Sequence, residues 1–131
     1  NGRVNGEIEV GKGTAYEMIA EFSNFSDDFG LKLRADENNE TVIKFDYKEK
    51  KLVLDRSRGE QPDKKPRKVY LGDIEKLDLR IFVDNSSVEV FVNGGKEVFS
   101  SRIFPQKDAD GIKVFSEGNV NVKIEKWEWQ D

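Results

Sequence analysis

Four charged side chains that could hold a polyol fall within one short stretch of the chain, residues 79–102. They are Arg80, Asp84, Glu89 and Arg102. Carboxylates accept hydrogen bonds from hydroxyl groups, and a guanidinium donates in a fixed fork, so together they suit the adjacent hydroxyls of a sugar. The alternative is that Arg80, Glu89 and Arg102 form a lattice of ion pairs covering a sheet. The residues alone leave both interpretations open.

Two hairpin turns would bring these side chains onto one surface. The stretch alternates apolar and polar residues, as strands do, and Asn85-Ser86 and Gly94-Gly95 are typical of two-residue turns. The first turn then pairs Arg80 with Phe91, and the second pairs Phe91 with Val98. A shift of one residue in either turn would exchange the two faces of a strand, so the assignment depends on register.

Cross-strand partners share a face, so this register sorts the side chains into two sets. The apolar set should face the core: Leu79, Ile81, Val83, Val88, Val90, Val92 and Phe99. The mixed set should face outward: Arg80, Phe82, Asp84, Ser87, Glu89, Phe91, Ser100 and Arg102. A phenylalanine among these charges could pack against the C–H face of a sugar ring.

The rest of the chain shows the same alternation. Residues 16–22, 29–34, 41–47 and 51–56 are expected strands, separated by turns rich in Asn, Asp, Lys and Glu. Short strands at this spacing predict an all-β fold, a two-sheet antiparallel β-sandwich of the jelly-roll or concanavalin-like kind. Residues 57–73 look like a long connection, an arm across one end of the sandwich, and strong strands resume at Leu77.

Length and composition exclude several classes of function. The 131 residues suit one domain, 1–131, and the 22 basic and 26 acidic residues are interleaved, so we expect no nucleic-acid partner. No apolar run approaches the length of a membrane span, so we expect no membrane partner. Histidine and cysteine are both absent, which removes the commonest general base and thiol chemistry. We expect no cofactor and no metal.

Three motifs carry a resemblance to a known family: LRIFVDNSSVEVFVNGG from Leu79, VFSSRIFP from Val98 and GIKVFSEG from Gly111. With them the chain resembles the C-terminal β-sandwich module of glycoside hydrolase family 32, which includes invertases, levanases, inulinases and other fructan β-fructosidases. The resemblance covers most of the chain from Tyr16 to Trp129, and residues 57–73 fit it least.

The resemblance implies a chain without catalytic residues. In that family, catalysis belongs to a separate N-terminal five-bladed propeller, whose carboxylates lie in Asn-Asp-Pro-Asn-like, Arg-Asp-Pro and Glu-Cys motifs. This chain has no cysteine and no Asp-Pro dipeptide. We therefore expect no enzymatic activity, and a single domain excised from a larger, secreted glycoside hydrolase.

Two functions remain open on the resemblance. A close relative, the levan-binding carbohydrate-binding module family 66, recognises a terminal fructose, so the domain would hold terminal fructosyl units of levan or inulin for the propeller. Alternatively, it buttresses the propeller and binds no sugar. The expected sugar site is Asp84, Glu89 and Arg102, helped by Arg80, with Arg56 of the LDRS segment as a weaker candidate. We expect a monomer.

Overall fold

The computed structural model describes residues 2–37, 40–58, 66–84, 87–95, 97–102 and 109–128, with the backbone alone at 56–58 and 99–102. These residues form ten strands: β1 Gly2–Lys12, β2 Tyr16–Ser23, β3 Phe29–Ala35, β4 Glu40–Asp46, β5 Lys51–Arg58, β6 Arg67–Tyr70, β7 Lys76–Val83, β8 Ser87–Val92, β9 Glu97–Arg102 and β10 Gly111–Glu128. Within the described ranges, no helix has the length and apolar character that crossing a membrane requires.

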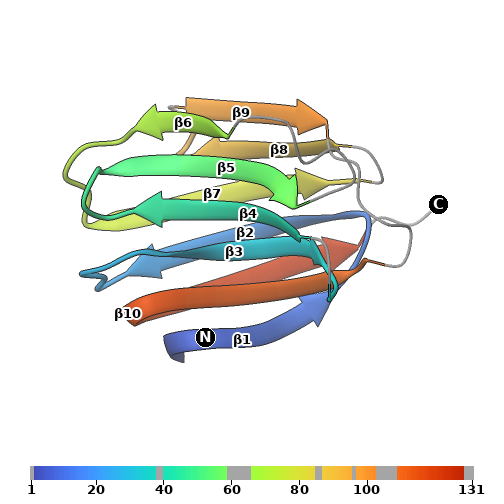
Figure 1. Ribbon diagram of the computed structural model, residues 1–131, viewed down its shortest axis with the longest axis horizontal. Helices are drawn as coiled ribbons and strands as arrows, with labels where there is room; N and C mark the ends of the chain where they lie inside the picture. Colours follow the sequence, from blue (N-terminus) through green and yellow to red (C-terminus); the bar gives the residue numbers. More distant parts are fainter. Residues whose placement is uncertain are drawn as a thin grey trace.

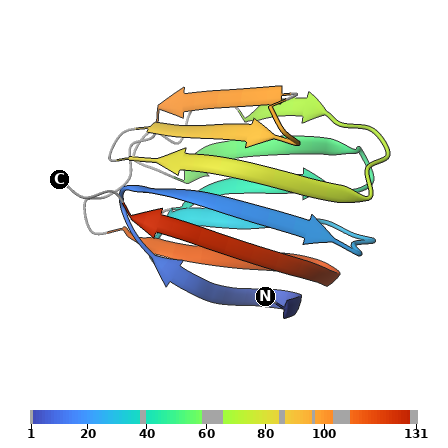
Figure 2. The ribbon, with the colours of Figure 1, turned by 180° about the vertical axis from the view of Figure 1, so that it is seen from behind.

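The strands follow one hydrogen-bonded path, β6-β5-β4-β3-β10-β2-β7-β8-β9, which curls into two layers, and β1 pairs with β10. The long strand β10 makes this possible, because residues 111–116 pair with β3 and residues 121–128 pair with β2. One layer faces the reader in Figure 1, and β2, β7, β8 and β9 of the other are in front in Figure 2. The predicted all-β antiparallel sandwich is confirmed.

The core lies between the layers and is built from alternate residues of each strand. Phe29 of β3 lies at its centre, with its ring centroid 4.7 Å from that of Phe22 and 5.6 Å from that of Phe45. All three side chains are at most 2% exposed. Burying a side chain of this size stabilises the fold by about 1.5–3 kcal/mol, so these rings are a large part of what joins the layers.

The predicted register of the β7–β8–β9 hairpins is confirmed. Arg80 pairs with Phe91, and Phe91 pairs with Val98. The predicted core-facing residues of β7 and β8 are each at most 1% exposed: Leu79, Ile81, Val83, Val88, Val90 and Val92. The side chain of Phe99 lies outside the described part of the chain.

Of the two predicted hairpin turns, the structure describes one. The predicted Gly94-Gly95 turn lies at the tip of the β8–β9 hairpin, whose last described pair is Val92 with Glu97, as the predicted register requires. Asn93, Gly94 and Gly95 have φ of 47°, 76° and 90°, so three successive left-handed residues extend the turn. The other predicted turn, Asn85-Ser86, lies outside the described residues.

Residues 57–73 are not only a connection, because strand β6 lies within this segment and pairs with residues 51–54 of β5. The strand was missed because it is an edge strand of four residues, in which Val69 is half-buried while Arg67, Lys68 and Tyr70 are exposed. A single packed side chain produces no readable alternation, and charged residues are common on sheet edges because they hinder pairing with other chains.

Candidate functional site

Two phenylalanine rings mark the outer face of the layer formed by β2, β7 and β8. Phe82 of β7 and Phe91 of β8 point away from the core and are half-buried. Their ring centroids are 5.7 Å apart at an interplanar angle of 80°, an edge-to-face contact that stabilises aromatic pairs. The predicted outward direction of both rings is confirmed, and together they form an aromatic corner on a sheet surface.

Arg80 lies beside this corner and is held by two contacts. Its Nε donates a hydrogen bond to Oε2 of Glu17 at 2.7 Å, and its Nη2 is 2.5 Å from the same oxygen. Its guanidinium carbon lies 5.6 Å from the ring centroid of Phe82. The Arg80 side chain is 57% exposed, so the pair adds little to stability. Its effect is to orient the guanidinium over the sheet.

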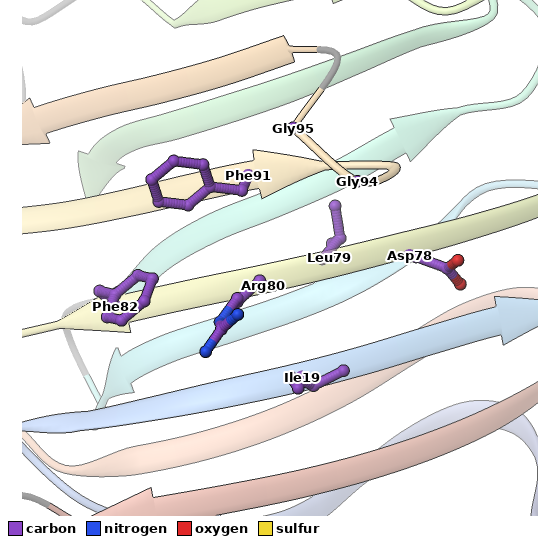
Figure 3. A pocket seen from close by; sticks show the side chains of 8 residues that line it. All are labelled: Ile19, Asp78, Leu79, Arg80, Phe82, Phe91, Gly94 and Gly95. Atoms are coloured by element: carbon purple, nitrogen blue, oxygen red, sulfur yellow. The ribbon is translucent and has the colours of Figure 1, made fainter.

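A hollow of about 380 Å³ opens next to these residues. It is lined by residues of β2, β7, β8 and the β8–β9 turn: Ile19, Asp78, Leu79, Arg80, Phe82, Phe91, Gly94 and Gly95. Figure 3 shows Asp78 and Arg80 along β7 and Phe91 on the neighbouring strand. Its apolar lining and its charged groups allow contact with a ligand that has one apolar face and several hydroxyls.

Asp84, a predicted site residue, follows β7 directly and bonds to Ser87, the first residue of β8. Its Oδ1 accepts hydrogen bonds from the backbone N–H of Ser87 at 2.7 Å and from the Ser87 hydroxyl at 3.0 Å. These bonds join the end of β7 to the start of β8. At least one of its oxygens is therefore already engaged.

The other predicted residues are distributed over both layers. Glu89 is exposed on the outer face of β8, opposite Phe82, so it shares a face with Arg80. Arg102 pairs with Ser87 through the backbone of β9, and its side chain lies outside the described part. Arg56 lies in β5 of the opposite layer, also without a described side chain. Whether any of them binds a sugar stays a prediction.

A buried arginine outside the predicted set connects three segments at the loop end of the sandwich. Arg34, at the end of β3, is 2% exposed with φ of 50°. Its Nε donates to the carbonyl oxygen of Ala109 at 2.5 Å, and its Nη1 is 3.5 Å from that of Thr14 and 3.4 Å from that of Asp84. Burial lowers the pKa of Arg34, and the nearby Tyr16, Asp110 and Asp84 oppose that shift.

The Tyr16 hydroxyl is buried near this arginine and has no hydrogen-bond partner among the described residues. Burial raises the pKa of the Tyr16 phenol far above its usual value, and the positive charge of Arg34 opposes the shift. The ring itself is contacted by Lys126, whose Nζ lies 5.5 Å from its centroid. Nothing in the local sequence distinguishes Tyr16 from a core tyrosine whose hydroxyl is satisfied.

The described residues contain no group of three or more acidic, His or Cys side chains placed to hold a metal ion.

The chain is similar over most of its length to a family of domains and to several hydrolases. The model of the family described as "Glycosyl hydrolases family 32 C terminal" matches residues 2–128. The levanase of Bacillus subtilis (strain 168) is 38% identical over 125 residues, covering 85% of this chain and 18% of that protein. A sucrose-6-phosphate hydrolase of Staphylococcus xylosus is 35% identical over 123 residues, covering 89% of this chain and 25% of that protein.

A solved structure supports the same relationship in three dimensions. The exo-inulinase from Aspergillus awamori superposes with a TM-score of 0.84 at 26% identity, covering 97% of this chain and 27% of that chain. The chain therefore spans between 18% and 27% of the length of these relatives.

Proposed function

The chain belongs to the family of C-terminal domains of family 32 glycosyl hydrolases, and from this membership we propose that it holds terminal fructosyl units of a fructan such as levan or inulin for an attached catalytic domain. The domain itself is noncatalytic. The names of its relatives, which include levanases and sucrose-6-phosphate hydrolases, support a parent enzyme that cleaves fructan or sucrose. Because levan is a polymer, we extend the proposal to a secreted parent.

The observation that carries the proposal is the outer face of β2, β7 and β8. There an aromatic corner, an oriented guanidinium and the exposed carboxylate of Asp78 surround a solvent-open hollow. A surface that only shields the sheet needs no hollow, whereas sugar recognition needs an apolar wall beside hydrogen-bonding groups. A volume of about 380 Å³ lies near the lower end of ligand pockets, about 300–1,000 Å³, and suits one sugar unit.

Calorimetric titration of the chain with levan, inulin and fructose tests this function. We expect binding to levan or inulin with a dissociation constant of about 10 μM to 1 mM, since one sugar unit offers few contacts. No fructose should be released during the titration. The absence of heat with all three ligands at millimolar concentration would contradict the proposal.

A second candidate function, a structural module that buttresses the catalytic domain, is favoured by another surface. A groove of about 470 Å³ runs along β1 and β10, and its lining includes Ile8, Val10 and Ile124. Ile8 is 47% exposed and Val10 is 39% exposed, although Ile8 pairs with the buried Val114. Contiguous exposed apolar side chains often mark contact surfaces.

The buttress role can be tested separately from sugar binding. Ile8→Ser in the parent enzyme should lower the melting temperature of the catalytic domain and leave levan binding unchanged. Tyr70→Ser, on the edge strand β6, is the control, because Tyr70 is 66% exposed and lies far along the sheet path from β1. Equal melting temperatures of the two variants would argue against the groove as an interdomain contact.

A further inference from the structure

We propose that the sugar ring binds in the hollow between Asp78, Arg80 and Phe91, rather than at the Asp84–Glu89 end of the same face. This inference rests on the proposed function and adds the position and the roles of the residues. Asp78 and Phe91 become binding residues, and Asp78 was absent from the predicted site.

The carboxylate of Asp78 is the acceptor that lines the hollow. Asp78 is exposed, and its side chain makes no hydrogen bond or ion pair within the described part of the chain. The backbone N–H of Asp78 donates to Oδ1 of Asn93 at 2.9 Å, which fixes the strand at that point and leaves the carboxylate oriented outward. Asp84, in contrast, already accepts two hydrogen bonds from Ser87.

Arg80 supplies donors two residues further along the same strand. Residues i and i+2 of a strand point to the same side, at a spacing of roughly 7 Å, and Figure 3 shows both side chains along β7. Glu17 engages the Nε and Nη2 atoms of Arg80, and among the described residues the Nη1 atom has no hydrogen-bond partner, so it can donate to a ligand. Asp78 can therefore accept from one hydroxyl of a ring while Arg80 donates to another.

Phe91 provides the apolar wall. It is paired with Arg80 across the β7–β8 ladder, and Ile19 is paired with Arg80 on the other side, so the three residues form one row across the face. The edge-to-face contact with Phe82 holds the Phe91 ring. The C–H face of a sugar ring can lie against it while the hydroxyls reach Asp78 and Arg80.

The rim of the hollow is open at Gly94 and Gly95. Gly94 and Gly95 line it, and a Cβ atom added to either would meet no heavy atom within 4 Å. A chain attached to the bound sugar can therefore leave the hollow over Gly94 and Gly95. The geometry thus suits the end unit of an oligosaccharide of hydroxyl-rich rings.

Titration of the chain and its variants with levan fragments and with fructose tests the position of the site. Asp78→Asn should weaken binding about tenfold or more, because one charge-assisted hydrogen bond is lost. Phe91→Leu, which keeps apolar volume and removes the ring, should weaken it about tenfold. The matched control is Glu89→Gln, an exposed carboxylate on the same face, which should stay within about twofold of the native chain.

The outcomes separate the site from the function. If the native chain binds and both Asp78→Asn and Phe91→Leu bind equally well, the inference is wrong while the proposed function stands. If Glu89→Gln alone abolishes binding, the sugar lies at the Asp84–Glu89 end. If the native chain binds neither ligand, the proposed function fails and the inference fails with it. Circular dichroism confirms that each variant is folded.

Discussion

At the scale of single residues, the two buried polar side chains at the loop end of the sandwich differ in what they contribute. Arg34 donates to the carbonyl of Ala109 and lies close to those of Thr14 and Asp84, so one side chain connects three segments that are distant in sequence. It does so from the left-handed region, φ of 50°, which costs a non-glycine residue about 1–2 kcal/mol. The hydroxyl of Tyr16 is buried beside it without a hydrogen bond among the described residues.

Arg34→Met should lower the free energy of unfolding by about 2–4 kcal/mol, because it leaves buried carbonyl oxygens without donors. Urea unfolding followed by tryptophan fluorescence measures the change. Arg80→Met is the matched control: that guanidinium is 57% exposed, and its loss should cost less than about 1 kcal/mol. Equal losses in the two variants would show that Arg34 does not hold the loop end.

Tyr16→Phe should leave the free energy of unfolding at pH 7 unchanged or higher, because it removes a buried hydroxyl with no hydrogen-bond partner among the described residues. The free energies of unfolding of the native chain and of Tyr16→Phe should diverge at alkaline pH. Burial raises the pKa of Tyr16 in the folded state above that of the unfolded chain, about 10. As the pH rises, the Tyr16 phenol therefore loses its proton first in the unfolded state. Deprotonation favours unfolding, so the free energy of unfolding of the native chain falls as the pH rises above about 10.

Urea titrations at pH 7 and above pH 10 check this difference. The native chain should lose more stability across that range than Tyr16→Phe. Tyr47→Phe serves as control, since Tyr47 is 41% exposed, and it should follow the native chain. Parallel curves for the native chain and Tyr16→Phe would mean that the phenol titrates normally.

At the scale of strands, local alternation predicts those elements that bury one complete face. The β7–β8–β9 register was predictable because six buried aliphatic side chains occupy alternate positions of β7 and β8, and Asn85-Ser86 and Gly94-Gly95 mark the predicted turns. The strand β6 was not predictable, because Val69 is its one residue that packs against the core. Strand β1 was not among the predicted strands either, since Val4 is its one buried residue.

Gly30 shows how closely two strands of this sandwich approach. It pairs with Lys44 of β4, and a Cβ atom at Gly30 would lie 2.0 Å from the carbonyl oxygen of Ile43. Gly30→Ala should therefore separate β3 from β4 and cost about 3 kcal/mol or more, measured by thermal or urea unfolding. Gly2→Ala, where nothing lies within 4 Å, should change stability by less than about 0.5 kcal/mol. A Gly30→Ala variant as stable as Gly2→Ala would refute the close approach.

At the scale of the whole molecule, the candidate site depends on pairings that no local pattern reveals. Strand β2 lies beside β7, so Glu17 meets Arg80 across 63 residues of sequence, and Ile19 enters the lining of the hollow. The strand order of the curled sheet is what places β2 beside β7. The sequence could therefore predict the outward face of β7 and β8, and could not predict that Glu17 orients Arg80 or that Asp78 lines the hollow.

The role of the domain in its parent enzyme leads to a prediction about two substrates of different size. If the hollow holds a fructan end, it raises the concentration of polymer at the catalytic domain. Asp78→Asn in the full-length enzyme should then raise KM for levan severalfold and leave KM and kcat for sucrose unchanged, because sucrose reaches the catalytic domain without being tethered. Steady-state kinetics on both substrates measure this. A purely structural domain would give unchanged kinetics on both, since Asp78 is exposed and its carboxylate has no partner in the described structure. A fall in kcat for both substrates would instead place Asp78 in contact with the catalytic domain.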